Sequence, residues 1–327
     1  MGIWDPSLWL PKEVTWETLE STETVLYPAS RDVYIAMGIG VILVCFRILL
    51  ESYVFVPIGW YFGWIKQPLQ ERIQTHLRGG FMGKSRLKRV SECGWRFFMF
   101  ISMFTAGYFV LRDQPQFYDV TECWKNWPSH HLPTKVYWYY TIETAFYWSL
   151  LFGHLFFDVR RHDFLQMLIH HTVTLGLLYI SWTMNMVRVG TLILFSHDAA
   201  DIFLELGKLF RYANWQSLLT ADFIVLLIVW LATRLYYYPF WIIRSIVFDA
   251  PQLIQSDYSW ANLTQKPIVP RVLMVMLCTL LVLHCFWTYI LFRIGYQAAT
   301  TPVGVDDIRE ESETDSEDEG PAKKKEN

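Results

Sequence analysis

The sequence is poor in charge and has no paired cysteine motif, and both shortages exclude classes of protein. Only 18% of its 327 residues are charged, against 53% hydrophobic and 17% aromatic, with a formal net charge of -3. This composition is typical of membrane proteins, and no nucleic-acid partner is expected. The five cysteines include no C-x-x-C pair, so neither a disulfide framework nor a zinc ribbon is indicated. No secretory signal is expected in the first thirty residues, which lack a basic segment followed by an apolar one.

Seven stretches are apolar and long enough to cross a bilayer core of about 30 Å. They begin near Val33, Trp95, Val136, Phe164, Val187, Leu218 and Val272. The first carries Arg47 and Glu51, which are four residues apart and can pair on one helix face. The sixth contains Pro239, which predicts a kink between Tyr236 and Phe240. The expected fold is therefore an all-α, multi-pass membrane protein.

Basic residues in the short loops predict the orientation. The loops after the first, third and fifth spans carry Lys66, Arg72, Arg78, Lys84, Arg86, Lys88 and Arg89, then Arg160 and Arg161, then Lys208 and Arg211. All three loops fall on one side, which is expected to be cytosolic, so that the N-terminus is lumenal and the C-terminus cytosolic. On the lumenal side, Asn262 begins an N-L-T glycosylation sequon close to the seventh span.

The end of the chain is strongly acidic from Asp306 to Glu319, and such a segment is expected to be disordered because it cannot bury a core. The hydroxyls that precede an acid by three residues are candidate sites for an acidophilic kinase: Ser312, Thr314 and Ser316. A merely solvating tail is the alternative. Lysines at the third and fourth positions from the C-terminus match the dilysine signal that retrieves proteins to the endoplasmic reticulum. We therefore expect a protein of that membrane.

Ionisable residues in the fourth and fifth spans are the candidate site. His170 and His171 lie in the fourth span, and His197, Asp198 and Asp201 lie in the fifth. At 1.5 Å per residue, the two histidines are roughly 10 to 12 Å from the cytosolic end, Asp201 about 10 Å and His197 about 16 Å. A short turn joins the two spans, so we expect antiparallel neighbours that meet at this depth. Charged groups are costly in hydrocarbon, which makes these residues functional candidates.

This combination of side chains has three interpretations. An aspartate beside a histidine holds its tautomer and stabilises the imidazolium, which suits a general base or a nucleophile. The same groups could join the two spans by hydrogen bonds, or could hold zinc or iron. The nine histidines form no H-x-x-x-H pair, so the membrane di-iron class is not expected. His284, alone in the seventh span, is expected to pack.

A long segment carries a family resemblance. From Tyr140 to Tyr212 the chain reads YTIETAFYWSLLFGHLFFDVRRHDFLQMLIHH, then TVTLGLLYISW, then VGTLILFSHDAADIFLELGKLFRY. This resembles the longevity-assurance motif of the ceramide synthases, within the TLC domain. The upstream segment KRVSECGWRFF and the N-terminal residues WLP and TW are also similar to that family. The homeobox-like insert of many animal members is not evident.

The resemblance implies a TLC bundle or barrel of six helices plus one N-terminal helix. It also implies transfer of a fatty acyl group from acyl-CoA to the amine of a sphingoid base, with no cofactor and no metal. The residues carried over as catalytic are His170, His171, Asp198 and Asp201, and the supporting ones are His197, Glu143, Tyr147 and Ser149. As a hypothesis, His170 takes the acyl group or deprotonates the amine, His171 assists, and the aspartates orient the imidazole.

The resemblance also extends to binding. Lys208 and Arg211 are candidates for contact with the acyl-CoA phosphates. The alternative is that they are ordinary cytosolic-side charges of the kind that the positive-inside rule describes. The loop Asp249 to Pro270 corresponds to the region that family members use to select acyl-chain length. Membrane lipids and a homodimer or heterodimer with related synthases are the further partners implied.

The expected organisation has five parts. They are a lumenal segment (1–32), the first span and an interfacial segment (33–65), a basic cytosolic loop (66–90), the TLC catalytic domain (91–298) and the acidic cytosolic tail (299–327). The alternative functions are a non-enzymatic TLC-domain lipid sensor or translocon-associated protein, and a transporter that uses the cluster as a proton relay. The complete set of histidines and aspartates favours catalysis.

Overall fold

The computed structural model describes residues 4–12, 14–23, 25–65, 68–83, 85–301 and 304–305, which contain helices and no strand. Lys66, Lys84, the candidate phosphosites and the dilysine signal lie outside these residues. The long helical stretches are α2 (Val33–Leu50) with η3 (Glu51–Phe55) and α3 (Val56–Tyr61), α5 (Arg86–Leu111), α6 (Thr134–Phe156), α7 (Phe164–Thr183), α8 (Val187–Tyr212), α9 (Gln216–Trp230) with η7 (Leu231–Ile243) and α10 (Arg244–Ile254), and α11 (Val269–Thr300). The short ones are α1 (Pro6–Trp9), η1 (Trp16–Leu19), η2 (Ser30–Asp32), α4 (Leu69–Leu77), η4 (Gly80–Met82), η5 (Pro115–Phe117) and η6 (Val120–Cys123).

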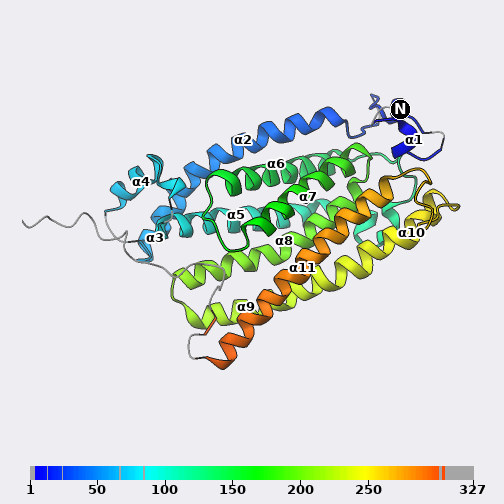
Figure 1. The fold of residues 1–327 in the computed structure, drawn as a ribbon. Coiled ribbons are helices and arrows are strands. Elements are labelled where there is room, and N and C mark those ends of the chain that lie inside the picture. The colour runs from blue at the N-terminus through cyan, green and yellow to red at the C-terminus, as the bar shows by residue number, and fades with distance from the viewer. Residues whose placement is uncertain are drawn as a thin grey trace, which may run out of the picture.

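Five of these stretches are long and apolar enough to cross a membrane: Ser30–Tyr61, Arg86–Leu111, Phe164–Thr183, Gln216–Ile254 and Val269–Thr300. The expected helical membrane protein is thereby confirmed. Helices α6 and α8 run alongside these five in Figure 1, but they carry more polar side chains. Their place as the third and fifth of seven spans stays a prediction.

Six of the stretches form a closed ring. Around it, α5 contacts α6, α6 contacts α7, α7 contacts α11, α11 contacts η7, η7 contacts α8, and α8 returns to α5. Helix α2 lies outside the ring and packs on α6, as Figure 1 shows. The six-helix bundle with one additional N-terminal helix therefore agrees with the expected architecture. The direct pairing expected of α7 and α8 is weaker than predicted, since each has its main partners elsewhere in the ring.

Pro239 disturbs the regular α-helical geometry of its span, and the kink predicted between Tyr236 and Phe240 stays a prediction. The disturbance is the wide π-helical stretch η7, which has Pro239 inside it. Proline has no backbone N–H, and its ring clashes with the carbonyl four residues earlier. A wider turn accommodates that clash, and π-helical turns are frequent at functional sites. Two large polar side chains of η7, Arg234 and Tyr238, are buried.

At one end of the bundle, here called the loop end, the connections are fastened to the helices. Asn185, with a φ of 51°, lies in the turn between α7 and α8. Its side-chain amide donates to the carbonyl oxygens of Pro128 (2.6 Å) and His130 (2.9 Å). Beside it, the indole of Trp127 donates to the carbonyl of Met184 (2.8 Å). The loop between α5 and α6 is therefore held against the α7–α8 turn.

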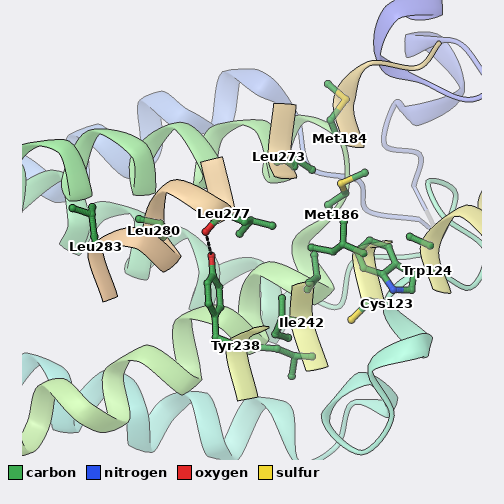
Figure 2. Close-up of a cluster of buried hydrophobic side chains, with 14 of the residues drawn as sticks. Cys123, Trp124, Met184, Met186, Tyr238, Ile242, Leu273, Leu277, Leu280 and Leu283 are labelled. Atoms are coloured by element: carbon green, nitrogen blue, oxygen red, sulfur yellow. Dashed lines mark hydrogen bonds between the residues drawn. The ribbon is translucent and has the colours of Figure 1, made fainter. Parts of the chain in front are cut away.

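An apolar core joins η7 and α11 next to these hydrogen bonds of the loop end. Figure 2 shows Tyr238 and Ile242 of η7 facing a row of leucines on α11. The Tyr238 hydroxyl donates to the carbonyl of Leu277 over 2.9 Å. A buried phenol needs such a partner, and this one links the two helices that close the ring.

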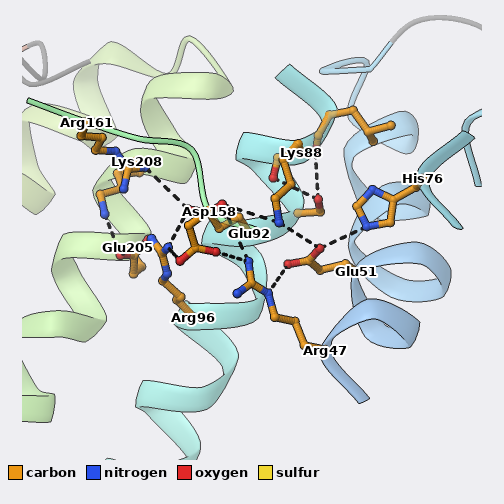
Figure 3. Close-up of polar contacts among 12 residues, drawn as sticks. Arg47, Glu51, His76, Lys88, Glu92, Arg96, Asp158, Arg161, Glu205 and Lys208 are labelled. Carbon is orange, nitrogen blue, oxygen red and sulfur yellow. Dashed lines mark hydrogen bonds and ion pairs between the residues drawn. The ribbon is translucent and has the colours of Figure 1, made fainter. Parts of the chain in front are cut away.

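The opposite end, here called the basic end, holds a buried charge network (Figure 3). Its members are Arg47, Glu51, His76, Lys88, Glu92, Arg96, Asp158, Arg161, Glu205 and Lys208. Arg47 pairs with Glu51 (2.7 Å), as predicted, and also with Asp158 (2.7 Å). Arg96 pairs with Glu92 and with Asp158, each at 2.6 Å. The network thus connects α2, α5, α8 and the α6–α7 loop.

Candidate active site

Two cavities enter the ring from its two ends. The apolar cavity is lined at the loop end by Trp124, Trp127, Ile254, Tyr258 and Pro270. The polar cavity is lined at the basic end by charged residues of the network and by others: Arg96, Asp158, Arg161, Asp163, Asp201, Glu205, Lys208 and Arg234. Only Tyr147 and His170 line both cavities, among the residues that the structure describes. These two side chains therefore mark the place where a polar and an apolar compartment meet.

His170 stands on α7 between two aromatic rings. Its centroid is 5.5 Å from the ring of Trp287 on α11 and 5.5 Å from that of His171. The Nδ1 atoms of both histidines are buried without a hydrogen-bond partner in the described part of the chain. Trp287 is itself held, because its indole donates to Asp163 over 3.2 Å. The imidazole of His170 is therefore positioned by packing.

Asp201 faces an arginine that the sequence analysis did not single out. Arg234 of η7 donates to Asp201 Oδ2 (3.0 Å) and to the carbonyl of His197 (2.9 Å). It also contacts Nε2 of His284 on α11 (3.3 Å). His284 was expected to be isolated and is instead part of this cluster. A positive charge within an apolar span was the signal that could have identified Arg234.

His197 and its neighbours complete the cluster. Its Nδ1 lies 2.7 Å from the carbonyl of Ile193, so this nitrogen carries the proton. Its ring lies 5.0 Å from His284 and 5.3 Å from Tyr238, between centroids. His197 lines the apolar cavity, whereas His171 and Asp201 line the polar one. His170 belongs to both.

Asp198 has no hydrogen-bond contact with His170 or His171 in the described residues. Its carboxyl group faces that of Glu143 on α6, and both side chains are fully buried. Neither residue lines the two cavities. Ser149 is buried as well, and its hydroxyl donates to the carbonyl of Phe146 (2.7 Å). Within the described residues, neither Asp198 nor Asp201 forms a hydrogen bond with His170 or His171. No direct contact therefore supports the hypothesis that the aspartates orient the imidazole.

The remaining candidates lie at the two ends. Lys208 pairs with Glu205 (2.6 Å) and lines the polar cavity. Arg211 lines a neighbouring side pocket. At the loop end, the segment Asp249 to Pro270 consists of the end of α10, a loop and the start of α11, and it lines the apolar cavity. Asn262 is exposed in that loop.

No group of three or more histidine, cysteine, aspartate or glutamate side chains in the described ranges is arranged to hold a metal ion. The ring contacts among His170, His171, His197 and His284 are between aromatic faces and edges. The chemistry that these residues can perform themselves is attack by an imidazole nitrogen and proton transfer.

Comparison with known proteins identifies the family. The TLC domain model matches residues 89–293. Ceramide synthase hyl-2 of Caenorhabditis elegans is 45% identical over 320 residues, which cover 97% of this chain and 95% of the relative. The chain belongs to the ceramide synthase family. Ceramide synthase hyl-1 of the same organism is 42% identical and covers 91% of this chain and 81% of its own length. Ceramide synthase 5 of Homo sapiens is 32% identical, covering 97% and 88%.

In this member of the ceramide synthase family, Tyr147 and His170 lie inside the helical ring, where the apolar and the polar cavity meet. Trp287 and Arg234 line the polar cavity beside that junction, and His284 contacts Arg234. All three come from η7 and α11, downstream of the segment from Tyr140 to Tyr212 that carries the resemblance. The motif therefore supplies only part of the site, and ring closure supplies the rest.

Proposed function

We propose that this ceramide synthase transfers a fatty acyl group from acyl-CoA to the amine of a sphingoid base at His170. One observation carries the proposal, which is that His170 and Tyr147 line both the apolar and the polar cavity. The acyl chain suits the apolar cavity, because burying each methylene stabilises the bound state by about 0.8 kcal/mol. CoA, a polar and anionic group, suits the basic end. The thioester then lies between them, beside His170.

The proposed reaction has two steps. In the first, an imidazole nitrogen of His170 attacks the thioester carbonyl, the carbon–sulfur bond breaks, and the CoA thiolate takes the proton that the imidazolium releases. Before the second step, the ammonium group of the sphingoid base loses one proton to solvent. The uncharged amine then attacks the acyl-imidazole, the carbon–nitrogen bond to His170 breaks, and the imidazole accepts the second amine proton. The products are the amide and CoA. His171, whose ring centroid is 5.5 Å away, assists the proton transfers.

The carboxylates have positioning roles in this proposal. Asp201 and Arg234 form a partly buried pair beside the cavity, and the guanidinium also holds the His197 carbonyl and His284. This fastens η7 to α8 and α11 around His170. Asp198 and Glu143 act on the α6–α8 contact, and hence on Tyr147, which is four residues from Glu143 on the same helix face.

We further propose that the basic end is cytosolic and that the protein resides in the endoplasmic reticulum membrane. The positive-inside rule supports the orientation, and the dilysine spacing supports the location. A cytosolic basic end allows acyl-CoA to reach the polar cavity from the aqueous side. Dimerisation with itself or with related synthases remains a proposal drawn from the family.

Intact-mass analysis of the purified protein after incubation with acyl-CoA alone tests the covalent step. We expect a mass gain equal to one acyl group, which sphinganine then removes. His170→Ala is expected to lose the adduct and the ceramide product, and Thr172→Ala, an exposed residue on the same helix, is expected to keep both. Full activity without an adduct would assign His170 the role of general base instead. Full activity of His170→Ala would remove it from the site.

A further inference from the structure

A buried carboxylate outside the site has no partner. Asp222 lies on α9, about 9 Å from the start of that helix at 1.5 Å per residue, and only 7% of its surface is exposed. Neither of its carboxylate oxygens has a hydrogen-bond partner within the described residues. An isolated charge away from water is costly and is retained mainly where it has a function.

The fold makes a specific place for this carboxylate. A Cβ atom on Gly207 of α8 would lie 2.6 Å from Asp222 Oδ2. A larger residue at this position would push the carboxylate away from α8. Asp222 also lines a side pocket between α8, α9 and α11, together with Leu219, Phe223 and Leu226.

The side pocket adjoins the polar cavity. Four residues line both: Leu204, Lys208, Leu291 and Ile294. Among the described residues that line the side pocket, Lys208 pairs with Glu205 (2.6 Å), and Arg211 lies over the ring of Tyr212. Within that part of the chain, the pocket therefore offers a carboxylate without a hydrogen-bond partner, an apolar wall and a connection to the compartment of His170.

We propose that Asp222 binds the ammonium group of the sphingoid base before the amine reaches His170. This inference rests on the proposed function, because it names the binding site of the second substrate. A long-chain primary amine is charged at neutral pH, as lysine is, and its bond to a carboxylate is charge-assisted and strong. Its hydrocarbon chain lies along Leu219, Phe223 and Leu226.

Steady-state kinetics with Asp222→Asn tests the inference, since asparagine keeps the shape and removes the charge. We expect the KM for sphinganine to rise about tenfold, the range expected for one charge-assisted hydrogen bond, with the KM for acyl-CoA unchanged. Asp113→Asn is the matched control, because this carboxylate is 55% exposed in a loop at the other end. An unchanged KM for sphinganine, or an equal rise in both KM values, would overturn the inference.

Two further measurements make the test specific. Octadecylamine is expected to compete with sphinganine in the unaltered enzyme and to compete about tenfold less well in Asp222→Asn, whereas octadecanol is expected to act equally on both. Equal loss for the amine and the alcohol would contradict a role for charge. Gly207→Ala, which displaces the carboxylate, is expected to raise the KM for sphinganine as well.

Binding of labelled sphinganine to His170→Ala protein in nanodiscs separates this inference from the proposed function. Binding that depends on Asp222 supports the inference even if His170→Ala retains activity and the proposed function fails. Binding that is equal with and without Asp222→Asn overturns the inference, whatever the role of His170.

Discussion

Arg234 is the residue that most changes the interpretation of the site. The sequence suggested that Asp201 balances an imidazole, but its carboxylate is 3.0 Å from the Arg234 guanidinium. The same guanidinium lies 5.1 Å above the ring of Trp230. One arginine therefore fastens α8 and α11 to η7, and its charge is matched by an aspartate carried over from the family motif.

Arg234→Met is expected to destabilise the protein, because it leaves Asp201 without its cation. Removing one partner of a buried ion pair costs about 3–5 kcal/mol, and we expect a value at the lower end because the Asp201 side chain is 19% exposed. Thermal unfolding of the purified protein in detergent measures the loss. The double variant Arg234→Met, Asp201→Asn is expected to recover most of the stability while acyl transfer stays low. A double variant as unstable as the single one would contradict the importance of this pair.

His130 is expected to make stability depend on pH. It lies outside the spans, and burial, helped by the nearby Arg188, lowers the pKa of its imidazole to about 3. The unfolded chain binds a proton near pH 6.5, whereas the folded protein does not until about pH 3. Stability therefore falls as the pH drops from 6.5 towards 3, by up to about 1.4 kcal/mol per pH unit.

His130→Leu is expected to flatten that dependence, which thermal unfolding between pH 6.5 and 4 would show. The control is Thr172→Ala at an exposed position, which removes no titratable group and is expected to leave the slope unchanged. Equal slopes in the unaltered protein and His130→Leu would show that other groups control the acid response.

At the scale of helices, the attachment of α2 to the rest of the fold depends on charged residues from other parts of the chain. Arg47 is 3% exposed and reaches Glu51 on its own helical stretch, Asp158 in the α6–α7 loop and Glu92 on α5. Arg47→Met is expected to cost about 3–5 kcal/mol. Arg112→Met, at an exposed and weakly paired position, is expected to cost less than about 0.5 kcal/mol. Comparable losses of thermal stability in the two variants would contradict this role of the network.

The sequence predicted elements better than it predicted contacts. Polar side chains in apolar spans identified His170 and Asp201, because such residues are conspicuous there. The second apolar stretch was expected to begin near Trp95, whereas helix α5 begins upstream of it, at Arg86. Charged residues such as Glu92 made its first turns look extramembrane, while in the fold they are buried in the network. Partners could not be predicted where they depend on π-helical η7 and on ring closure, as for His284.

At the scale of the whole molecule, the depth of the apolar cavity beyond His170 is expected to limit the length of the acyl chain that the enzyme accepts. Along α7, Thr174, Leu178 and Ser181 line this cavity at about 6, 12 and 16 Å from His170 by helical rise. Tryptophan at each position is expected to shorten the longest acyl group accepted, most at Thr174 and least at Ser181. Mass spectrometry of ceramides made from a mixture of acyl-CoAs measures this order.

Val173→Trp is the matched control for that series, because Val173 is on the same helix and does not line the cavity. It is expected to leave the product distribution unchanged. A shift of equal size at all three cavity positions would contradict a chain that extends from His170 towards the loop end.

The Arg47–Glu51 pair is local, so it can form before the rest of the charge network has been synthesised. Both residues belong to the first span, whereas Glu92 and Asp158 are synthesised later. On the nascent chain, the two charges can neutralise each other one helical turn apart, which lowers the cost of leaving α2 in lipid by itself. Asp158 then arrives with the α6–α7 loop and draws the arginine into the larger network. The pair is therefore expected to ease insertion of the first span into the membrane before the other helices are in place.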